Sequence, residues 1–323
     1  MSEVLLRAKD VVKSFASRHH RGQVAVAVNG VSLEVRRGET LGIVGESGCG
    51  KSTLARCLVQ LLPVTSGTVE FNGTVLTGLS RRQLRPHRRD MQLVFQDPYA
   101  SLNPRRTVGD IVADPMRIHR VGTESEITER VQQLFATVGL EPSYLKRYPH
   151  EFSGGQRQRV GIARSLALNP LLLVADEPVS ALDVSIQAQV LNLMADLQQQ
   201  LALTYVFIAH DLGVVRHVSD RVGVMYLGEI VELGDAKTLY ERPLHPYTEA
   251  LLSVVPELND TDGPRRERIV IGGDVPDPAD RPTGCAFHPR CPVATERCTI
   301  ERPQLVEIGP GRSVACHHPR NTT

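Results

Sequence analysis

The chain has 323 residues, of which 41% are hydrophobic and 23% are charged, and this composition excludes a disordered or collagen-like protein. Its 37 lysines and arginines nearly balance its 36 aspartates and glutamates, so no overall field favours nucleic acid or an anionic bilayer as a partner. No apolar stretch approaches the roughly 18 residues of a membrane-spanning helix and no secretory signal is evident, so we expect a cytosolic or membrane-peripheral protein.

Two segments near the N-terminus alternate in hydrophobicity around Asn-Gly pairs. Apolar residues alternate on both sides of Asn29-Gly30, and a similar stretch surrounds Asn72-Gly73. Asn-Gly is favoured in two-residue hairpin turns because both positions tolerate a positive φ. The pattern therefore predicts antiparallel strands joined by two hairpin turns.

Three continuous apolar runs follow along the chain, at residues 41–45, 171–175 and 205–209. Such runs are typical of strands in a parallel sheet that is buried on both faces, although a buried helix segment is possible for any single run. Polar residues come directly after each run. Because ligands bind at the carboxyl ends of strands in open α/β sheets, we expect the three ends to form one site.

Helical patterns separate these runs. Thr123 and Glu126 have the spacing of a capping box before an amphipathic stripe that ends at Val138, and a second stripe covers residues 185–202. Beyond about residue 255 the chain is rich in proline, glycine and aspartate, which indicates a linker before a small cysteine-bearing tail. The predicted fold class is α/β, with a parallel-sheet core and an antiparallel β flank over residues 1–255 and an extension over residues 256–323.

The segment GESGCGKS fits the phosphate-binding pattern G-x-x-x-x-G-K-[ST] and lies between the first apolar run and a helical segment. Backbone N–H groups of such a loop surround one anion, Lys51 reaches the terminal phosphates and Ser52 can bind Mg²⁺. A chance glycine-rich turn is the alternative, and Cys49 is expected to be a small filler. The predicted nucleotide-binding residues of this loop are Gly45, Glu46, Ser47, Gly48, Cys49, Gly50, Lys51, Ser52 and Thr53.

Charged residues end the second and third apolar runs. An acidic residue at the end of a buried strand needs a cation or hydrogen-bond donors, so Asp176 is a predicted Mg²⁺ partner. Glu177 can then deprotonate the attacking water, and His210 can donate a hydrogen bond to charge that develops on the γ-phosphate. The alternatives are two solvated carboxylates and a structural histidine.

The segment Ser153-Gly154-Gly155-Gln156 identifies a family. It precedes a helical segment and resembles the signature of the ATP-binding subunits of ABC transporters, whose fold adds a helical subdomain to the P-loop core. The resemblance implies that each ATP lies between the P-loop of one subunit and this signature of another, in a head-to-tail dimer. A serine at a helix start, with backbone donors around it, suits an anion.

Further residues match this family in order. The resemblance implies that Gln96 binds Mg²⁺ and senses the membrane subunit, that Ser180 to Asp183 form the loop that crosses the dimer, and that His210 is the switch histidine. It also places Phe15 against the adenine ring, for which the alternative is an ordinary core phenylalanine.

Two further segments and the cysteine-bearing tail resemble one subfamily, the importers of oligopeptides, dipeptides and nickel. The segments FQDPYASLNPRRTV and LHPYTEALLSVVPE carry this resemblance. Some members of the peptide group hold a [4Fe–4S] cluster on the cysteines of such a C-terminal extension, which makes four cysteines of this chain candidate ligands. Zn²⁺ and free thiols are the alternatives, although the cysteine spacing lacks the close C-x2-C pairs of most structural zinc sites. These cysteines are Cys285, Cys291, Cys298 and Cys316.

The resemblance implies a peripheral protein at the cytoplasmic face of the plasma membrane. Its expected partners are a second, non-identical ATPase subunit, two transmembrane permease subunits and, through the permease, an extracytoplasmic binding protein, with no nucleic acid. The predicted function is ATP hydrolysis that powers import of di- or oligopeptides. Alternatives are an importer subunit for nickel or another small solute, a regulatory subunit with little hydrolysis, and a soluble ABC ATPase without a transport role.

Overall fold

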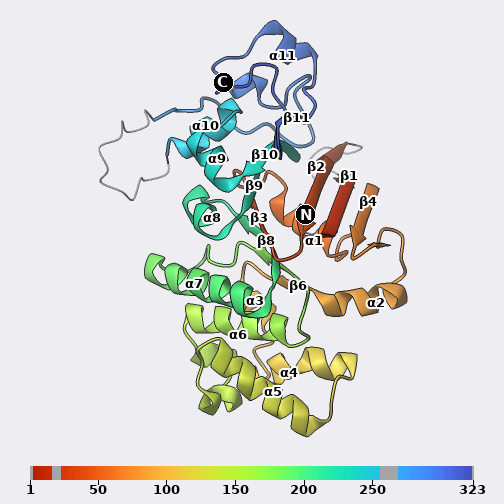
Figure 1. The fold of residues 1–323 in the computed structure, drawn as a ribbon, viewed down its shortest axis with the longest axis vertical. Coiled ribbons are helices and arrows are strands. Elements are labelled where there is room, and N and C mark those ends of the chain that lie inside the picture. The colour runs from red at the N-terminus through yellow and green to blue at the C-terminus, as the bar shows by residue number, and fades with distance from the viewer. Residues whose placement is uncertain (1–2, 17–22, 255–267, 322–323) are drawn as a thin grey trace. The chain divides into compact units, whose positions relative to one another are not determined.

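The structure is a computed structural model that describes residues 3–16, 23–254 and 268–321. The chain divides into two compact units (Figure 1). The first, here called the helical unit, comprises residues 36–38 and 78–207, and the second, the sheet unit, comprises residues 3–35, 39–77 and the described residues from 208 onward. The predicted boundary between residues 255 and 256 lies outside the described residues.

The helical unit is built on parallel strands. β6 pairs in parallel with β7 from Met91 opposite Leu172 to Val94 opposite Ala175, and β8 is the next strand beyond β7. Every residue of β7 is buried, as the continuous apolar run predicts. The strands of this unit are β6 (Met91–Val94), β7 (Leu172–Asp176) and β8 (Thr204–Ala209), whose last two residues belong to the sheet unit.

Three α-helices of this unit begin with a capping box, at Ser80, Thr123 and Ser153. The box at Thr123 and Glu126 confirms the prediction from their spacing. The helices are α2 (Arg81–Asp90), α3 (Pro98–Ser101), α4 (Val108–His119), α5 (Glu124–Thr137), η1 (Pro142–Lys146), η2 (Pro149–Glu151), α6 (Gly154–Leu166) and α7 (Val184–Leu201).

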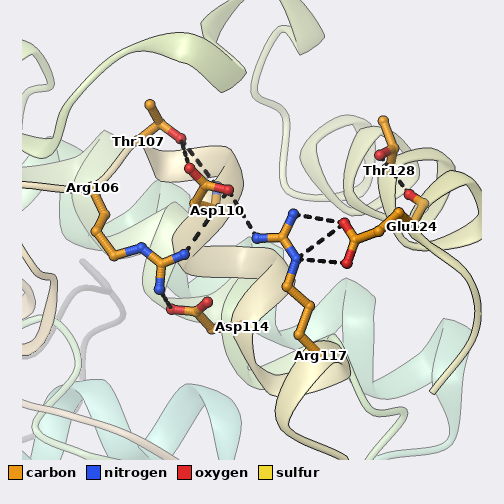
Figure 2. Close-up of polar contacts among 7 residues, drawn as sticks. All are labelled: Arg106, Thr107, Asp110, Asp114, Arg117, Glu124 and Thr128. Atoms are coloured by element: carbon orange, nitrogen blue, oxygen red, sulfur yellow. Dashed lines mark hydrogen bonds and ion pairs between the residues drawn. The ribbon is translucent and has the colours of Figure 1, made fainter. Parts of the chain in front are cut away.

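An ion-pair network joins α4 to the start of α5 (Figure 2). Arg117 donates to Glu124 at 2.9 Å and to Asp110 at 2.9 Å, and Arg106 donates to Asp114. The hydrogen bond from Arg117 lowers the pKa of the Asp110 carboxyl. Because these side chains are partly exposed, each pair stabilises the fold only modestly.

The sheet unit contains two sheets. One has the strand order β11-β12-β10-β9-β3, in which β3 and β9 are parallel and the remaining pairs are antiparallel. The other is antiparallel where its pairing is described, with the order β2-β1-β4-β5. The strands are β1 (Val4–Ala16), β2 (Val24–Arg36), β3 (Thr40–Val44), β4 (Ser66–Phe71), β5 (Thr74–Val75), β9 (Arg221–Tyr226), β10 (Glu229–Asp235), β11 (Val306–Gly309) and β12 (Arg312–Val314).

The C-terminal extension continues the first of these sheets, because β12 pairs with β10 through Glu232 opposite Val314. The sequence pattern predicted a tail and did not indicate this pairing. The helices of the sheet unit are α1 (Lys51–Leu58), α8 (Leu212–Val218), α9 (Ala236–Glu241), α10 (Pro246–Leu252), η3 (His288–Arg290) and α11 (Glu296–Ile300).

One of the two predicted hairpin turns is wrong. Asn72 and Gly73, at φ +49° and +75°, do form the turn between β4 and β5. Asn29 and Gly30 instead lie inside the single long strand β2. The Asn29 N–H donates to the Gly228 carbonyl at 2.8 Å, and its side chain donates to Glu229 at 2.7 Å. Contacts with the β9–β10 turn therefore hold this part of the chain within β2, although Gly30 has φ +69°.

We predict that Thr123→Ala lowers the free energy of unfolding by about 1 kcal/mol, because the first turn of α5 loses its N-cap acceptor. Urea denaturation followed by circular dichroism measures this change. Thr137→Ala is the control, since Thr137 bonds only to the Gln133 carbonyl at the end of the same helix, and we expect a change below about 0.5 kcal/mol. Equal losses in the two variants would contradict the capping argument.

Candidate nucleotide-binding and hydrolysis site

The predicted phosphate loop connects β3 to α1 in the sheet unit. Ser47 and Gly48 are exposed at its tip, and Ser52 and Thr53 lie in the first turn of α1. Gly50 has φ +104°, and a Cβ there would lie 2.0 Å from the Ala27 carbonyl oxygen. Only glycine therefore fits at this position, both for its backbone angle and for the space beside β2.

Lys51 is buried, with 4% of its surface exposed, and holds the loop closed. Its ammonium donates to the carbonyls of Gly45 at 2.7 Å and Glu46 at 2.9 Å. Burial raises the pKa of the neighbouring Cys49 thiol, so this side chain is a neutral thiol at physiological pH. The geometry agrees with the prediction that Cys49 fills space in the loop.

Gln96 and Glu177 belong to separate sequence motifs, and the fold of the helical unit brings them into contact. The Gln96 amide donates to the Glu177 carboxylate at 2.9 Å. Both residues follow strands that are neighbours, β6 and β7, so their carboxyl ends meet at one edge. Asp176, the last residue of β7, is only 1% exposed, and Glu177 adopts the left-handed φ of +47°.

The signature segment forms the start of α6. The Ser153 hydroxyl accepts from the Gln156 N–H at 3.3 Å, and the Gln156 side chain accepts from the Ser153 N–H at 3.0 Å. A Cβ at Gly155 would lie 2.4 Å from the Ile186 side chain, so glycine lets α7 pack closely against this turn. Asp183 is the N-cap residue of α7, with no capping bond from its side chain.

Phe15 and His210 lie in the sheet unit. Phe15 is 41% exposed at the end of β1, with the Lys13 ammonium 5.0 Å from its ring centroid. It is therefore not a core phenylalanine, the alternative raised by the sequence. His210 is exposed directly after β8, and the next residue, Asp211, caps α8 by accepting from the Gly213 N–H at 2.7 Å.

The four cysteines of the extension line one cavity in the sheet unit, together with His245 and Phe287. Burial raises the pKa of Cys285 to about 11, and it also raises the pKa values of Cys291 and Cys316. Within residues 3–16, 23–254 and 268–321, however, no group of three or more ligand side chains is placed to hold a metal ion. The iron–sulfur site expected from the sequence is thus not supported by the geometry.

Two residues from distant segments contact the phosphate loop, and the sequence motifs did not indicate either of them. Arg290 of the extension donates to the Glu46 carboxylate at 2.7 Å, and the Tyr247 hydroxyl accepts from the Glu46 N–H at 2.9 Å. Tyr247 lies within LHPYTEALLSVVPE, one of the two segments that carried the subfamily resemblance, and Arg290 lies in the tail between Cys285 and Cys291. Their contact with the loop has no local signal, because it depends on pairing between distant parts of the chain.

A P-loop before α1, a glutamate after β7 and a capped signature helix together define an ATPase of the ABC class. Comparison with protein families agrees. Residues 28–180 match the ABC transporter family, and residues 231–298 match the oligopeptide/dipeptide transporter C-terminal region. No helix in the part of the chain that the structure describes is long and apolar enough to cross a membrane.

Named relatives cover nearly the whole chain. The oligopeptide transport ATP-binding protein AppF of Bacillus subtilis is 55% identical over 98% of this chain and 97% of its own length. The di/tripeptide transport ATP-binding protein DppF of Pseudomonas aeruginosa is 54% identical over 98% of each chain. The chain therefore belongs to the family of oligopeptide and dipeptide ABC transport ATP-binding proteins.

Solved structures also resemble this chain. The ATP-binding cassette MJ0796, described as a dimer in a post-hydrolysis state bound to ADP and Pi, has a TM-score of 0.66 and 30% identity. It covers 72% of this chain and 99% of its own. This likeness confirms the predicted fold class.

We predict that Gly50→Ala weakens ATP binding by about 100-fold or more, equal to about 3 kcal/mol, because the new methyl group displaces the loop from β2. Fluorescent-nucleotide titration of the full-length chain measures the dissociation constant. Gly73→Ala is a matched control, since Gly73 also has a positive φ, of +75°, but no atom within 4 Å of the added Cβ. Unchanged affinity in Gly50→Ala would show that the loop tolerates the displacement.

Proposed function

We propose that this chain is the ATP-hydrolysing subunit that powers import of oligopeptides or dipeptides through separate permease subunits. The observation that carries the proposal is that one chain contains both an ABC transporter region and an oligopeptide/dipeptide transporter C-terminal region. The names of AppF and DppF, which refer to oligopeptide and to di/tripeptide transport, support this class of cargo.

In this proposal the loop that ends at Lys51 binds the terminal phosphates through its backbone amides and its ammonium. Ser52, Asp176 and Gln96 are the proposed Mg²⁺ partners. The bound ion would neutralise charge on the phosphate oxygens. Hard oxygen donors of this kind, which include the buried Asp176 carboxylate, suit Mg²⁺.

Glu177 is the proposed general base that takes a proton from the attacking water. Its contact with Gln96 supports this role, because the amide orients the carboxylate before any substrate arrives. His210 is proposed to donate a hydrogen bond to charge that develops on the γ-phosphate. Phe15, which is 41% exposed, is proposed to stack on the adenine.

We further propose a head-to-tail dimer of ATPase subunits, with a second, non-identical subunit as the partner. Each ATP would contact the P-loop of one subunit and the Ser153–Gln156 turn and Asp183 loop of the other. The dimeric state of the MJ0796 cassette supports this arrangement. The start of α6, which is 13 residues long, carries the positive end of a helix dipole and so favours an anion.

The remaining partners are two transmembrane permease subunits and, through them, an extracytoplasmic binding protein. The proposed location is the cytoplasmic face of the plasma membrane. The relatives of this ATPase are named for transport, yet no helix among the described residues could span a bilayer. Peripheral association with the permease would account for both observations.

We predict that Glu177→Gln retains ATP binding but lowers ATP turnover by roughly 100- to 10,000-fold, because the amide cannot accept the proton from water. The test uses the transporter assembled in vesicles with its permease and binding protein, and it measures ATP turnover and uptake of labelled oligopeptides, dipeptides and nickel. Peptide uptake should be lost with turnover.

Glu129→Gln is the control for this variant, because Glu129 lies on the exposed face of α5, where it accepts only a 3.4 Å bond from Gln133. Both activities should persist in that variant. If the assembled transporter took up nickel and no peptides, the proposed peptide cargo would be wrong and nickel would take its place. Normal turnover in Glu177→Gln would refute the assignment of the general base.

We also propose that the four cysteines of the extension bind a [4Fe–4S] cluster, with Zn²⁺ as the alternative. They line one cavity and match the ligand count of such a cluster, but their side chains are not placed as a metal-binding group among the described residues, so they would have to move together to bind it. Because burial raises the pKa values of Cys285, Cys291 and Cys316, these three thiols are protonated at physiological pH, and a metal would have to displace their protons to bind. A bound metal would staple a segment that is too small to build a core of its own.

We predict that protein purified without oxygen is brown and contains roughly four iron and four sulfide per chain. Cys298→Ser should lose most of the iron, whereas Cys57→Ser, which changes a buried cysteine of α1 far along the chain, should retain it. Metal analysis and absorption spectra measure both. A colourless protein with zinc would establish the alternative metal, and a metal-free protein would show that the cysteines are plain thiols.

A further inference from the structure

Arg290 joins the extension to the phosphate loop, 244 positions earlier in the sequence. Its side chain is only 7% exposed. The guanidinium donates to both oxygens of Glu46, at 2.7 Å and 3.1 Å. A bidentate, largely buried pair of this kind fixes the relative orientation of both side chains, which a single solvated contact does not.

Glu46 is held at three different groups: its carboxylate, its N–H and its carbonyl. Besides the carboxylate, its N–H donates to the Tyr247 hydroxyl at 2.9 Å, and its carbonyl accepts from Lys51 at 2.9 Å. The second residue of the phosphate loop is therefore restrained from outside the loop by α10 and by η3. These restraints act on the loop residue that carries one of the acceptors for the Lys51 ammonium.

An aromatic cluster backs these polar contacts. The ring of Phe287 lies 5.2 Å from that of Tyr226 and 5.3 Å from that of Tyr247, and all three side chains are buried. The Tyr226 hydroxyl also accepts a long bond, of 3.4 Å, from Arg290. Because Phe287 also lines the cysteine cavity, continuous packing connects that cavity with the loop.

A second arginine of the extension supports the backbone behind the loop. Arg281 donates to the Leu227 carbonyl at 2.5 Å and pairs with Glu229, so it holds the β9–β10 turn. That turn in turn donates to the loop, through the Gly228 N–H to the Cys49 carbonyl at 2.8 Å. The extension thus contacts the loop directly at Glu46 and indirectly at Cys49.

We propose that Arg290 is a positioning residue for nucleotide binding, which holds Glu46 so that the phosphate loop is formed before ATP arrives. This inference rests on the proposed function of the loop in ATP binding. A preformed loop avoids the cost of ordering its backbone on binding. Without Arg290, the Glu46 carboxylate would be left partly buried beside the loop and would draw the chain towards solvent.

The test measures ATP binding to the full-length chain by fluorescent-nucleotide titration and ATP turnover in the assembled transporter. We expect Arg290→Met to raise the dissociation constant of ATP about 10-fold and to raise KM by a similar factor. The value of kcat should change less than about twofold, because saturating ATP restores the loop. Arg290→Lys, which keeps the charge and loses the fork, should fall between wild type and Arg290→Met.

Glu46→Gln tests the same contact from the loop side, without any change in the extension. Arg290→Met combined with Glu46→Gln should weaken binding no further than the stronger single variant, because both remove one interaction. The matched control is Arg297→Met, since Arg297 pairs with Glu301 at 2.7 Å on the exposed face of α11. Its affinity for ATP should equal that of wild type.

A purely structural role would lower the melting temperature of Arg290→Met and leave its ATP affinity unchanged, which would overturn the inference. Additive effects of Arg290→Met and Glu46→Gln would overturn it as well, because they would show two independent interactions. If wild type itself did not bind ATP, the proposed function would fail. Tight binding by wild type and Arg290→Met alike would remove only the positioning role.

Discussion

The close approach of backbone to backbone around the phosphate loop is the constraint on which the nucleotide site depends. At Gly45 and Gly50 an added Cβ would lie 2.1 Å from the Met225 carbonyl and 2.0 Å from that of Ala27. Strand β9 therefore lies directly against the loop at Gly45, and strand β2 lies directly against it at Gly50. At these two positions only glycine fits. A loop confined in this way keeps its amides in place without help from bound phosphate, so less conformational entropy is lost on binding.

The C-terminal extension is part of this confinement rather than an independent appendage. Its strand β12 pairs with β10, and β10 pairs with β9, the strand whose Met225 carbonyl limits the space at Gly45. The buried carboxylate of Glu232 in β10 accepts from the N–H groups of Leu244 and His245 at 2.9 Å, which ties α10 to the same sheet. Backbone pairing and charge-assisted hydrogen bonds thus connect the extension to the loop.

Local signals predicted local structure well, and contacts between distant segments explain where prediction stopped. The capping box at Thr123 and the Asn72-Gly73 turn are each determined within a few residues, so their patterns were sufficient. Asn29-Gly30 carries the same turn signal, yet the β9–β10 turn supplies the hydrogen bonds that keep it in a strand. The contact between Arg290 and Glu46 spans most of the chain, and no spacing rule indicates it.

The end of β7 shows how backbone strain and side-chain contact act together in the helical unit. Glu177 adopts φ +47°, a region that costs a residue with a Cβ about 1–2 kcal/mol. Parallel pairing of β7 with β6 holds the strand in place up to Ala175. The backbone strain is therefore confined to the turn that follows the strand. The turn directs the carboxylate towards Gln96, whose amide lies 2.9 Å away. Because a general base must be oriented before it can accept a proton, this strained turn is the feature we expect the proposed chemistry to require.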